Sequence, residues 1–332
     1  MTDLITQFQH AMKTRNIEII KQLILTNNNI IKQEFLLHRV VEKENHRKYK
    51  KFIQNIIELL INSGADINKQ DINGDTPLHL AVCFEQSTSI IKFLILNNAD
   101  VNIQNNIGEK PIHYAVSSYN YNINIIELLI LNDSDINAHN IEGRIPLHYA
   151  LETSSDTQII IEMLIKYGSD INKQDIDGDT PLHIAVTELH LQCESKLTPS
   201  YEILIKHGAD INKQNNNGDT PLHLAVKDLI DEEDTIDSTM IQKFKFLIKY
   251  AMANPNIKNN DNKTPLDIAL IYLPNSYITN LFISHNKKLF QYACIALKSH
   301  NIADNALFLI GKNILNTLPD KEISDIIIQN YT

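Results

Sequence analysis

One short motif recurs along this 332-residue chain and constrains its fold more than any other feature. Thr-Pro-Leu-His stands at residues 76–79, 180–183 and 220–223, each time followed by Leu or Ile and then Ala-Val. Weaker copies begin at Lys110, Ile145 and Thr264. The prolines of the six copies are residues 77, 111, 146, 181, 221 and 265, so successive spacings are 34, 35, 35, 40 and 44. A period of this length predicts a stack of similar supersecondary units, each contacting its neighbours.

The residue types of the motif suit the first turn of a helix. Threonine is a good N-cap because its hydroxyl accepts a hydrogen bond from an unsatisfied backbone N–H group. Proline fits the next position, where its missing N–H costs nothing. A second apolar run accompanies the motif, as at residues 56–61 and 160–165, and its width predicts burial on more than one side. Each repeat is therefore predicted to be a pair of helices.

Glycine marks the ends of these helices and the turns between them. Gly64, Gly168 and Gly208 follow the second helix, where a left-handed residue is needed. Asn262 takes a turn position in the sixth copy, because asparagine also tolerates left-handed backbone. Five glycines lie three residues before a proline of the motif: Gly74, Gly108, Gly143, Gly178 and Gly218. Since eight of the nine glycines serve turns or caps, no cluster remains to cradle a phosphate.

These residues resemble the ankyrin repeat over roughly residues 50–285. A second shared element, Gly-Ala-Asp-Ile-Asn at residues 64–68, returns at 208–212 and, with Ser169 in place of alanine, at 168–172. The resemblance implies an all-α solenoid of about eight helix pairs with short β-hairpin-like fingers and a C-terminal helical segment. We expect N-terminal capping helices at residues 1–30, repeats at 31–285 and the C-terminal segment at 286–332, because end repeats contact one neighbour only.

Charge and cysteine content narrow the function classes. The net charge is −10 and no basic stripe is present, which argues against nucleic-acid binding. Cys83, Cys193 and Cys294 are far apart, which indicates a reducing compartment rather than a disulfide framework. The N-terminus lacks the apolar stretch of a secretory signal, and no run is long enough to span a membrane. We expect a monomer that does not bind membranes, in the cytoplasm or nucleus, acting in a host cell after secretion or viral expression.

Five histidines occupy one position of the repeat: His79, His113, His148, His183 and His223. Packed helices lie about 8–10 Å apart, so equivalent histidines are too distant to share a metal ion held at about 2 Å. We interpret them as buried residues that bond backbone between repeats. An enzyme that uses His190 and Cys193 stays open as a hypothesis of another class. We predict no catalytic residue, no metal ligand and no cofactor.

Partner specificity is predicted in the connections between the first and second helices, because the turns between repeats are nearly alike. The connections at residues 84–90, 117–123 and 152–158 vary, and those at 187–200 and 227–240 are longer insertions. The acidic stretch of the last insertion lacks the alternating oxygens of an EF-hand loop. We expect the following insertion residues to contact the partner: Glu188, His190, Gln192, Glu194, Asp231, Glu232, Glu233 and Asp234.

The C-terminus reads Leu-Pro-Asp-Lys-Glu-Ile from residue 318, with apolar residues at helical spacing after it. This is similar to the start of an F-box, and a truncated F-box after ankyrin repeats resembles the PRANC arrangement of poxvirus ankyrin proteins and of ankyrin effectors from rickettsia-like bacteria. The resemblance implies docking on the Skp adaptor of a cullin-based ubiquitin ligase by Leu318, Pro319, Glu322, Ile323, Ile326 and Ile327. The alternative is a C-terminal helix that caps the last repeat.

Two hypotheses of function follow. The chain is either an effector that binds a host protein and recruits a ubiquitin ligase, or a scaffold that only sequesters its partner. The resemblance also implies that five asparagines are sites for the host hydroxylase that modifies ankyrin repeats: Asn68, Asn102, Asn137, Asn172 and Asn212.

Overall fold

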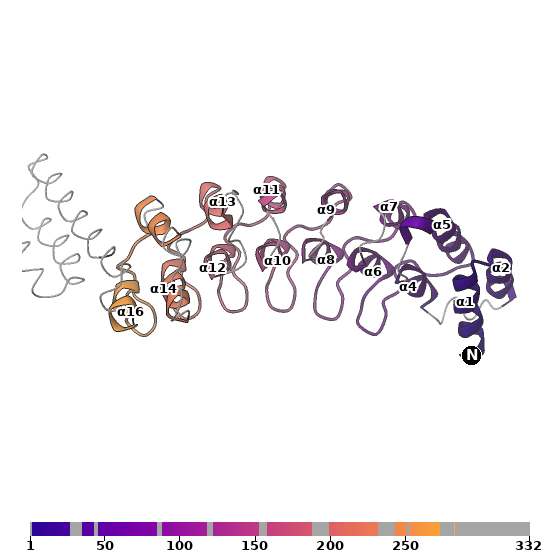
Figure 1. Cartoon of the computed structure of the whole chain (residues 1–332), viewed down its shortest axis with the longest axis horizontal. Coiled ribbons are helices and arrows are strands. Elements are labelled where there is room, and N and C mark those ends of the chain that lie inside the picture. The colour runs from indigo at the N-terminus through magenta and orange to yellow at the C-terminus, as the bar shows by residue number, and fades with distance from the viewer. Residues whose placement is uncertain are drawn as a thin grey trace, which may run out of the picture. The chain divides into compact units, whose positions relative to one another are not determined.

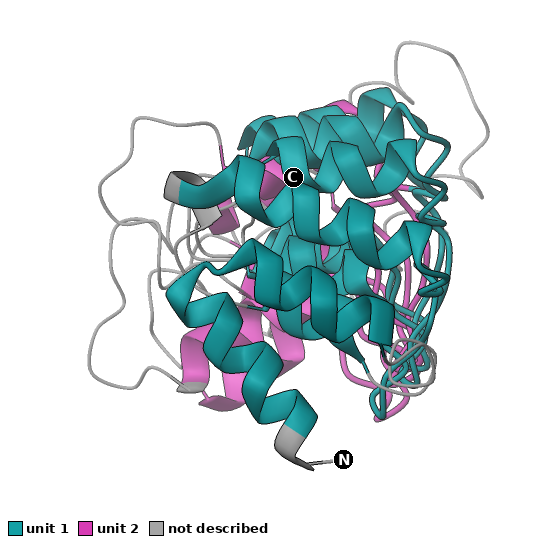
Figure 2. Ribbon diagram, turned by 90° about the vertical axis from the view of Figure 1, so that its right-hand side faces the viewer, with its two compact units in different colours: residues 1–170 teal, residues 171–332 magenta. Residues whose placement is uncertain are grey.

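A computed structural model describes residues 2–26, 35–42, 46–84, 88–117, 122–152, 158–187, 199–231, 243–250, 253–272 and 282. These residues form 15 helices and no β-strand. The all-α fold of stacked helix pairs is therefore confirmed. The chain divides into two compact units, residues 1–170 and 171–332 (Figure 2).

Unit 1 is a row of helix pairs. The pairs are α1 (Thr2–Thr14) with α2 (Ile17–Thr26), α4 (Leu36–Val41) with α5 (His46–Asn62), α6 (Pro77–Cys83) with α7 (Thr88–Leu96), α8 (Pro111–Ser117) with α9 (Ile123–Ile130), and α10 (Pro146–Glu152) with α11 (Gln158–Lys166). The first helices of successive pairs, α4, α6, α8 and α10, pack on one another as an inner row, while the outer helices lie on one side of it (Figure 1). The turns that enter α6, α8 and α10 project as fingers on the opposite side (Figure 1).

Unit 2 repeats this arrangement. It contains α12 (Pro181–Thr187) with α13 (Ser200–Lys206), α14 (Pro221–Asp231) with the π-helix η2 (Phe246–Tyr250), and α16 (Pro265–Tyr272). The inner helix α14 packs against both α12 and α16. Phe282 is fully buried and its ring meets that of Phe244 edge to face, with 4.8 Å between centroids.

The motif forms the start of an inner helix as its residues predict. Thr76 is extended and caps α6, because its hydroxyl accepts a hydrogen bond from the backbone N–H of His79 at 3.4 Å. Pro77 is the first residue of the helix. Leu78 and Ala81 are fully buried, where the small alanine allows neighbouring helices to approach. Every later inner helix in the described part of the chain also begins at its motif proline.

The fingers are closed turns. In the first one, Asp71 N donates to Asp75 O at 2.9 Å and Gly74 N donates to Asp71 O at 3.0 Å. Gly74 has φ +79°, and a Cβ at this position would lie 2.6 Å from Asn106 N. Asn262, in the equivalent position, has φ +61°. The left-handed turn residues predicted from the sequence are thus confirmed.

The outer helices supply much of the core. In α7, Ile90, Ile91 and Leu94 are fully buried, which is the pattern of a helix packed on more than one side. No helix among the described residues is long and apolar enough to cross a membrane. The expected boundaries at residues 30 and 285 stay predictions.

Candidate protein-binding surface

Five buried histidines connect an inner helix to the neighbouring finger. His79 Nε2 lies 3.1 Å from the backbone oxygen of Glu109, which belongs to the next finger. The same connection joins His38 to Asp75 O, His113 to Ala138 O, His183 to Asp219 O and His223 to Lys263 O, all at 3.0–3.1 Å. These contacts support the interpretation of His79, His113, His183 and His223 as structural residues. Sequence reasoning did not include His38, although the Leu37-His38 pair matches the Leu-His of the motif.

The hydrogen bonds fix the protonation state of these rings. The backbone N–H of Thr76 donates to His79 Nδ1 at 3.1 Å, so Nδ1 carries no proton and Nε2–H donates to Glu109 O. Burial lowers the pKa of His79 below its usual value and lowers the pKa of His113 to about 4. The rings are therefore neutral at pH 7 and hold the fingers as neutral hydrogen-bonding groups.

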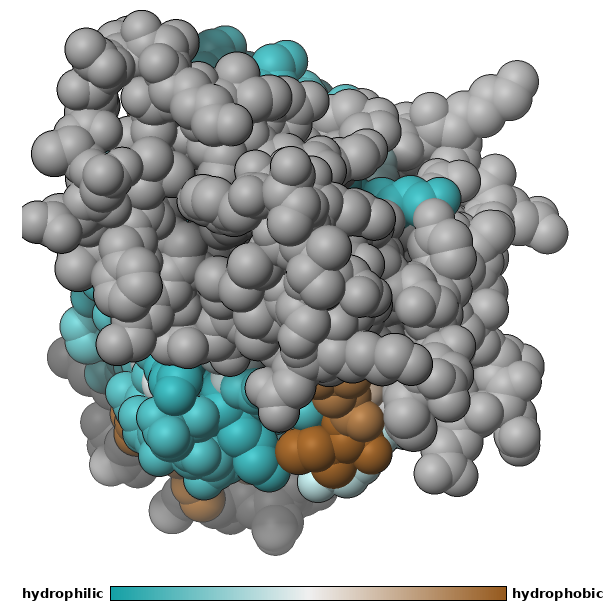
Figure 3. Space-filling model, turned by 90° about the vertical axis from the view of Figure 1, so that its left-hand side faces the viewer, coloured by the Kyte–Doolittle hydropathy of each residue, from teal (hydrophilic) through white to brown (hydrophobic). Residues whose placement is uncertain are grey.

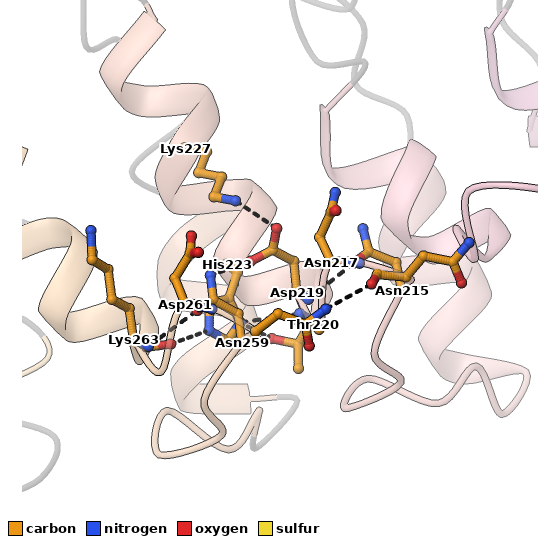
Figure 4. A network of polar contacts seen from close by, with 12 residues as sticks. Asn215, Asn217, Asp219, Thr220, His223, Lys227, Asn259, Asp261 and Lys263 are labelled. Atoms are coloured by element: carbon orange, nitrogen blue, oxygen red, sulfur yellow. Dashed lines mark hydrogen bonds and ion pairs between the residues drawn. The ribbon is translucent and has the colours of Figure 1, made fainter.

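A second set of contacts joins finger to finger in unit 2 (Figure 4). Asp219 is fully buried, and its carboxylate accepts a hydrogen bond from Asn259 Nδ2 at 2.9 Å and lies 2.5 Å from Lys227 Nζ. Asn259 belongs to the next finger, where its Oδ1 accepts from the backbone N–H groups of Asp261 and Lys263 at 3.1 Å. One asparagine thus shapes its own turn and satisfies a buried carboxylate of the preceding repeat.

Unit 1 uses tyrosines in the same kind of contact. Tyr114 Oη donates to the Asp75 carboxylate at 3.2 Å, and Asn105 Nδ2 donates to the same oxygen at 2.9 Å. Tyr149 Oη donates to the Glu109 carboxylate. Burial raises the pKa of Glu109, although the hydrogen bond from Tyr149 opposes this shift. The carboxylates of Asp75 and Glu109 are therefore already bonded within the repeats.

The sequence analysis missed these hydrogen bonds between neighbouring fingers, although a pattern in the sequence indicates them. In these fingers an asparagine stands three residues before the turn glycine, or before Asn262 where it replaces glycine. In the preceding finger an acidic residue directly follows the turn glycine. The pairs that bond directly are Asn105 with Asp75, Asn215 with Asp179 and Asn259 with Asp219. Burial raises the pKa of Asp179, against the effect of its bond from Asn215.

The five asparagines predicted as hydroxylation sites lie in the turns that follow the outer helices, and we call this set the asparagine ladder. Asn68 Nδ2 donates to Asn98 O at 3.2 Å, and its Oδ1 accepts from Asp100 N at 2.8 Å. Equivalent bonds join Asn102 to Asp133 and Asp135, Asn137 to Gly168 and Asp170, and Asn172 to Gly208 and Asp210, while Asn212 accepts from Asn254 N. Each asparagine therefore links two successive repeats, which gives it a structural role independent of any modification.

A buried lysine, Lys243, bonds to residues near the start of both insertions. Lys243, the first described residue after the second insertion, is fully buried. Its Nζ donates to the backbone oxygen of Val186, one residue before the C-terminal end of α12 and the first insertion, and to Asp228 Oδ2 at 2.8 Å. Asp228 lies in α14, so the sequence-based start of the second insertion at residue 227 is wrong. Helix α14 extends to Asp231, and its last turns contain the buried Leu229 and place Asp228 beside Lys243.

Several predicted site residues lie outside the described part of the chain. They are Glu188, His190, Gln192 and Glu194 of the first insertion, Glu232, Glu233 and Asp234 of the second, and the C-terminal set Leu318, Pro319, Glu322, Ile323, Ile326 and Ile327. Asp231 is the last residue of α14. Within the described ranges, no group of three or more His, Cys, Asp or Glu side chains is arranged to hold a metal ion.

Comparison with known proteins gives one family. The model for ankyrin repeats in three copies matches in overlapping windows, at residues 7–105, 37–140, 83–175, 112–200, 156–238 and 189–293. The chain is similar to the crystal structure of the ankyrin repeat domain of Bcl-3, described as a unique member of the IkappaB protein family. The TM-score is 0.55 at 24% identity, and the match covers 70% of this chain and 92% of that one. No curated protein matches the sequence.

Proposed function

Because this chain belongs to the ankyrin-repeat family, whose repeats make it a protein–protein interaction adaptor, we propose that it captures a host protein and delivers it to a ubiquitin ligase. Ankyrin repeats are typically interaction domains rather than enzymes. The observation that carries the capture step is the bonded lattice of fingers and inner helices, because a surface fixed before binding loses little entropy when a partner docks. Function still depends on the residues displayed on this scaffold.

The two insertions are the proposed specificity elements. They differ from each other and from the other connections, whereas the fingers are nearly alike. Lys243 bonds the end of α12 to α14, so the described residues next to both insertions share one buried anchor. We therefore treat the insertions as one binding region.

Exchange of the insertions tests this assignment. Residues 188–198 and 232–240 are replaced by short Gly-Ser connections, which leaves α14 and Lys243 intact. We expect loss of the host protein captured by the wild-type chain in a pull-down identified by mass spectrometry, with an unchanged helical circular dichroism spectrum. The matched control changes two exposed outer-helix acids, Glu127→Ala and Glu162→Ala, and retains capture. Undiminished capture of the host protein by the exchanged variant would show that the insertions do not determine partner specificity.

The proposed recruitment of a ubiquitin ligase is supported by the sequence of the C-terminal motif, which begins at Leu318. Purified Skp adaptor is offered to the full-length chain and to a Leu318→Ala/Pro319→Ala variant, with Leu315→Ala as a control for loss of an apolar side chain nearby. We expect binding of the wild type and the control, and at least about a tenfold loss in the double variant. Absence of adaptor binding by the wild type removes the ligase function and leaves the sequestering scaffold.

One observation favours that second function. The last described helix, α16, leaves Ile271 and Tyr272 more than half exposed. The view from the side of α16 shows a small hydrophobic patch beside hydrophilic residues (Figure 3). A C-terminal cap on α16 would cover such side chains without any ligase. In that case truncation after residue 285 lowers the melting temperature, whereas a ligase arm leaves it unchanged.

The asparagine ladder carries a proposal of its own. The five asparagines at the outer-helix ends are proposed to accept one oxygen each from a host hydroxylase, as the family resemblance implies. Intact-protein mass spectrometry after expression in a eukaryotic cell measures the added oxygens. A mass unchanged from that of the bacterially expressed chain excludes the modification.

A further inference from the structure

The inner helix α4 carries an arginine whose side chain has no partner in the described part of the chain. Arg39 Nε is buried without a hydrogen-bond partner, although the residue as a whole is partly exposed. No ion pair or hydrogen bond joins its guanidinium group to another described residue. A buried donor without an acceptor costs stability, because water no longer solvates it. The half-buried position of this guanidinium group is therefore unfavourable in the chain on its own.

The two other arginines with described side chains are both engaged. The guanidinium group of Arg15 lies over the Tyr49 ring, 3.4 Å from its centre, and Arg144 Nη1 lies 2.6 Å from Glu152 Oε1. Glu42, which is the acid nearest to Arg39 in the described sequence, is the exposed C-cap residue of α4 and makes no ion pair with it. Arg39 thus differs from these arginines because neither a ring nor an acid of the described residues takes up its charge.

The position of Arg39 in the repeat is one at which polar side chains bind carboxylates. Arg39 directly follows the histidine of its inner helix, as do Tyr114 in α8 and Tyr149 in α10. Tyr114 Oη donates to the Asp75 carboxylate at 3.2 Å, and Tyr149 Oη donates to the Glu109 carboxylate. Both polar residues that share this position with Arg39 in the described part of the chain therefore donate to an acid.

The chemistry of the side chain defines which group fits Arg39. A tyrosine is a neutral donor, whereas a guanidinium group carries a charge and presents parallel N–H donors that match the two oxygens of a carboxylate. Nε–H and one Nη–H form such an edge. Because Arg39 Nε is covered in the described conformation, the side chain must rotate toward solvent to offer this edge. That rotation is favoured when a carboxylate is present, since it gives the unpaired donor an acceptor.

We propose that Arg39 is a carboxylate-binding residue, which takes up an aspartate or glutamate side chain of the protein that the repeats capture. The proposal rests on the adaptor function proposed above, but it involves neither the insertions nor the C-terminal motif. It defines the chemistry of the partner at one place, because the partner must bring an acidic side chain to the inner row at α4.

NMR of the arginine side chains tests this assignment on the full-length chain. The chain has four arginines, so isotope labelling of arginine gives four Nε–H signals. The probe is the peptide acetyl-Gly-Asp-Gly-amide, and the reference peptide has asparagine in place of aspartate. We expect the aspartate peptide to shift the Arg39 signal to saturation, with at least about a tenfold lower Kd than the reference peptide. Equal Kd values for the two peptides overturn the proposal, and tighter binding of sodium acetate would identify a site for a small carboxylate instead.

Replacement of Arg39 separates a binding role from a structural one. Leu80 and Leu224 stand at the equivalent position, so Arg39→Leu suits an inner helix. The melting temperature should not fall, because this change removes a buried donor without a partner. Binding of the aspartate peptide, followed by the backbone amide signals of α4, should weaken at least about tenfold, whereas the control Arg144→Gln should bind as the wild type does. A clear fall in the melting temperature, or undiminished binding by Arg39→Leu, refutes the assignment.

Two acids close in sequence provide the intramolecular alternative. Glu34→Gln and Glu42→Gln remove them one at a time. If either change shifts the Arg39 Nε–H signal of the free chain as far as saturation with the aspartate peptide does, Arg39 is paired within the chain and the proposal is overturned. An unchanged signal in both variants supports an unpaired guanidinium group. Failure of the insertion exchange or of the adaptor pull-down leaves these results standing.

Discussion

At the scale of single residues, buried histidines form hydrogen bonds between neighbouring repeats. The ring of His113 accepts from the backbone N–H of Lys110 at 3.0 Å and contacts Ala138 O of the next finger at 3.1 Å. Both contacts require the neutral Nε2–H form, because a proton on Nδ1 would meet a backbone donor. Because only the neutral ring of His113 can make both contacts, its protonation should weaken the bond between the two repeats.

Acidification should therefore destabilise the chain. The pKa of His113 is lowered to about 4 in the folded state, so the unfolded chain binds protons first as the pH falls below the ordinary value of 6.5. Stability is complete above about pH 6.5 and declines toward about pH 4, by up to about 1.4 kcal/mol per pH unit for each such histidine. The raised pKa values of Glu109 and Asp179 act in the opposite direction at the acid end of this range. Urea midpoints at about pH 7.5, 6.5 and 5.5 measure the effect, and equal midpoints would contradict it.

At the scale of elements, local signals were predictable and long-range contacts were not. The inner helices begin at their motif prolines because the threonine cap and the proline act within one turn. The length of α14 and the presence of the π-helix η2 were not predictable in this way. Both elements adjoin the contact of Lys243 with Asp228, and the repeat pattern gives no relation between these two residues. The exposure of Ile72 was likewise unpredictable, since Ile67 is the same residue type five positions earlier and is buried.

Removal of the Lys243 ammonium group should loosen this end of unit 2. Lys243→Met keeps the aliphatic side chain but takes away the bonds to Val186 O and Asp228 Oδ2. Breaking a buried ion pair costs about 3–5 kcal/mol, because the remaining charge stays poorly solvated. The free energy of unfolding from urea titration should fall by about that amount. Lys243→Met/Asp228→Asn should recover part of the loss, and a double variant as unstable as the sum of the two single variants would argue against the pair.

At the scale of the whole molecule, each described repeat contacts its neighbours within its own unit. The His79, Asn105 and Asn68 contacts all run from one repeat to the next. Stability in such an array is approximately a sum of repeat terms and nearest-neighbour terms. A local defect should therefore spread over adjacent repeats and fade along the unit.

Gly74→Ala tests this expectation. Gly74 has φ +79°, and its added Cβ would lie 2.6 Å from the backbone nitrogen of Asn106, so the first two fingers must separate. Gly168→Ala is the control, because φ is +93° there but no atom lies within 4 Å of the new Cβ. The control should lose about 1–2 kcal/mol from left-handed strain alone, and Gly74→Ala should lose more. Hydrogen exchange should quicken in residues 71–75 and 105–109 while α1 keeps its protection, and uniform quickening over unit 1 would contradict nearest-neighbour coupling.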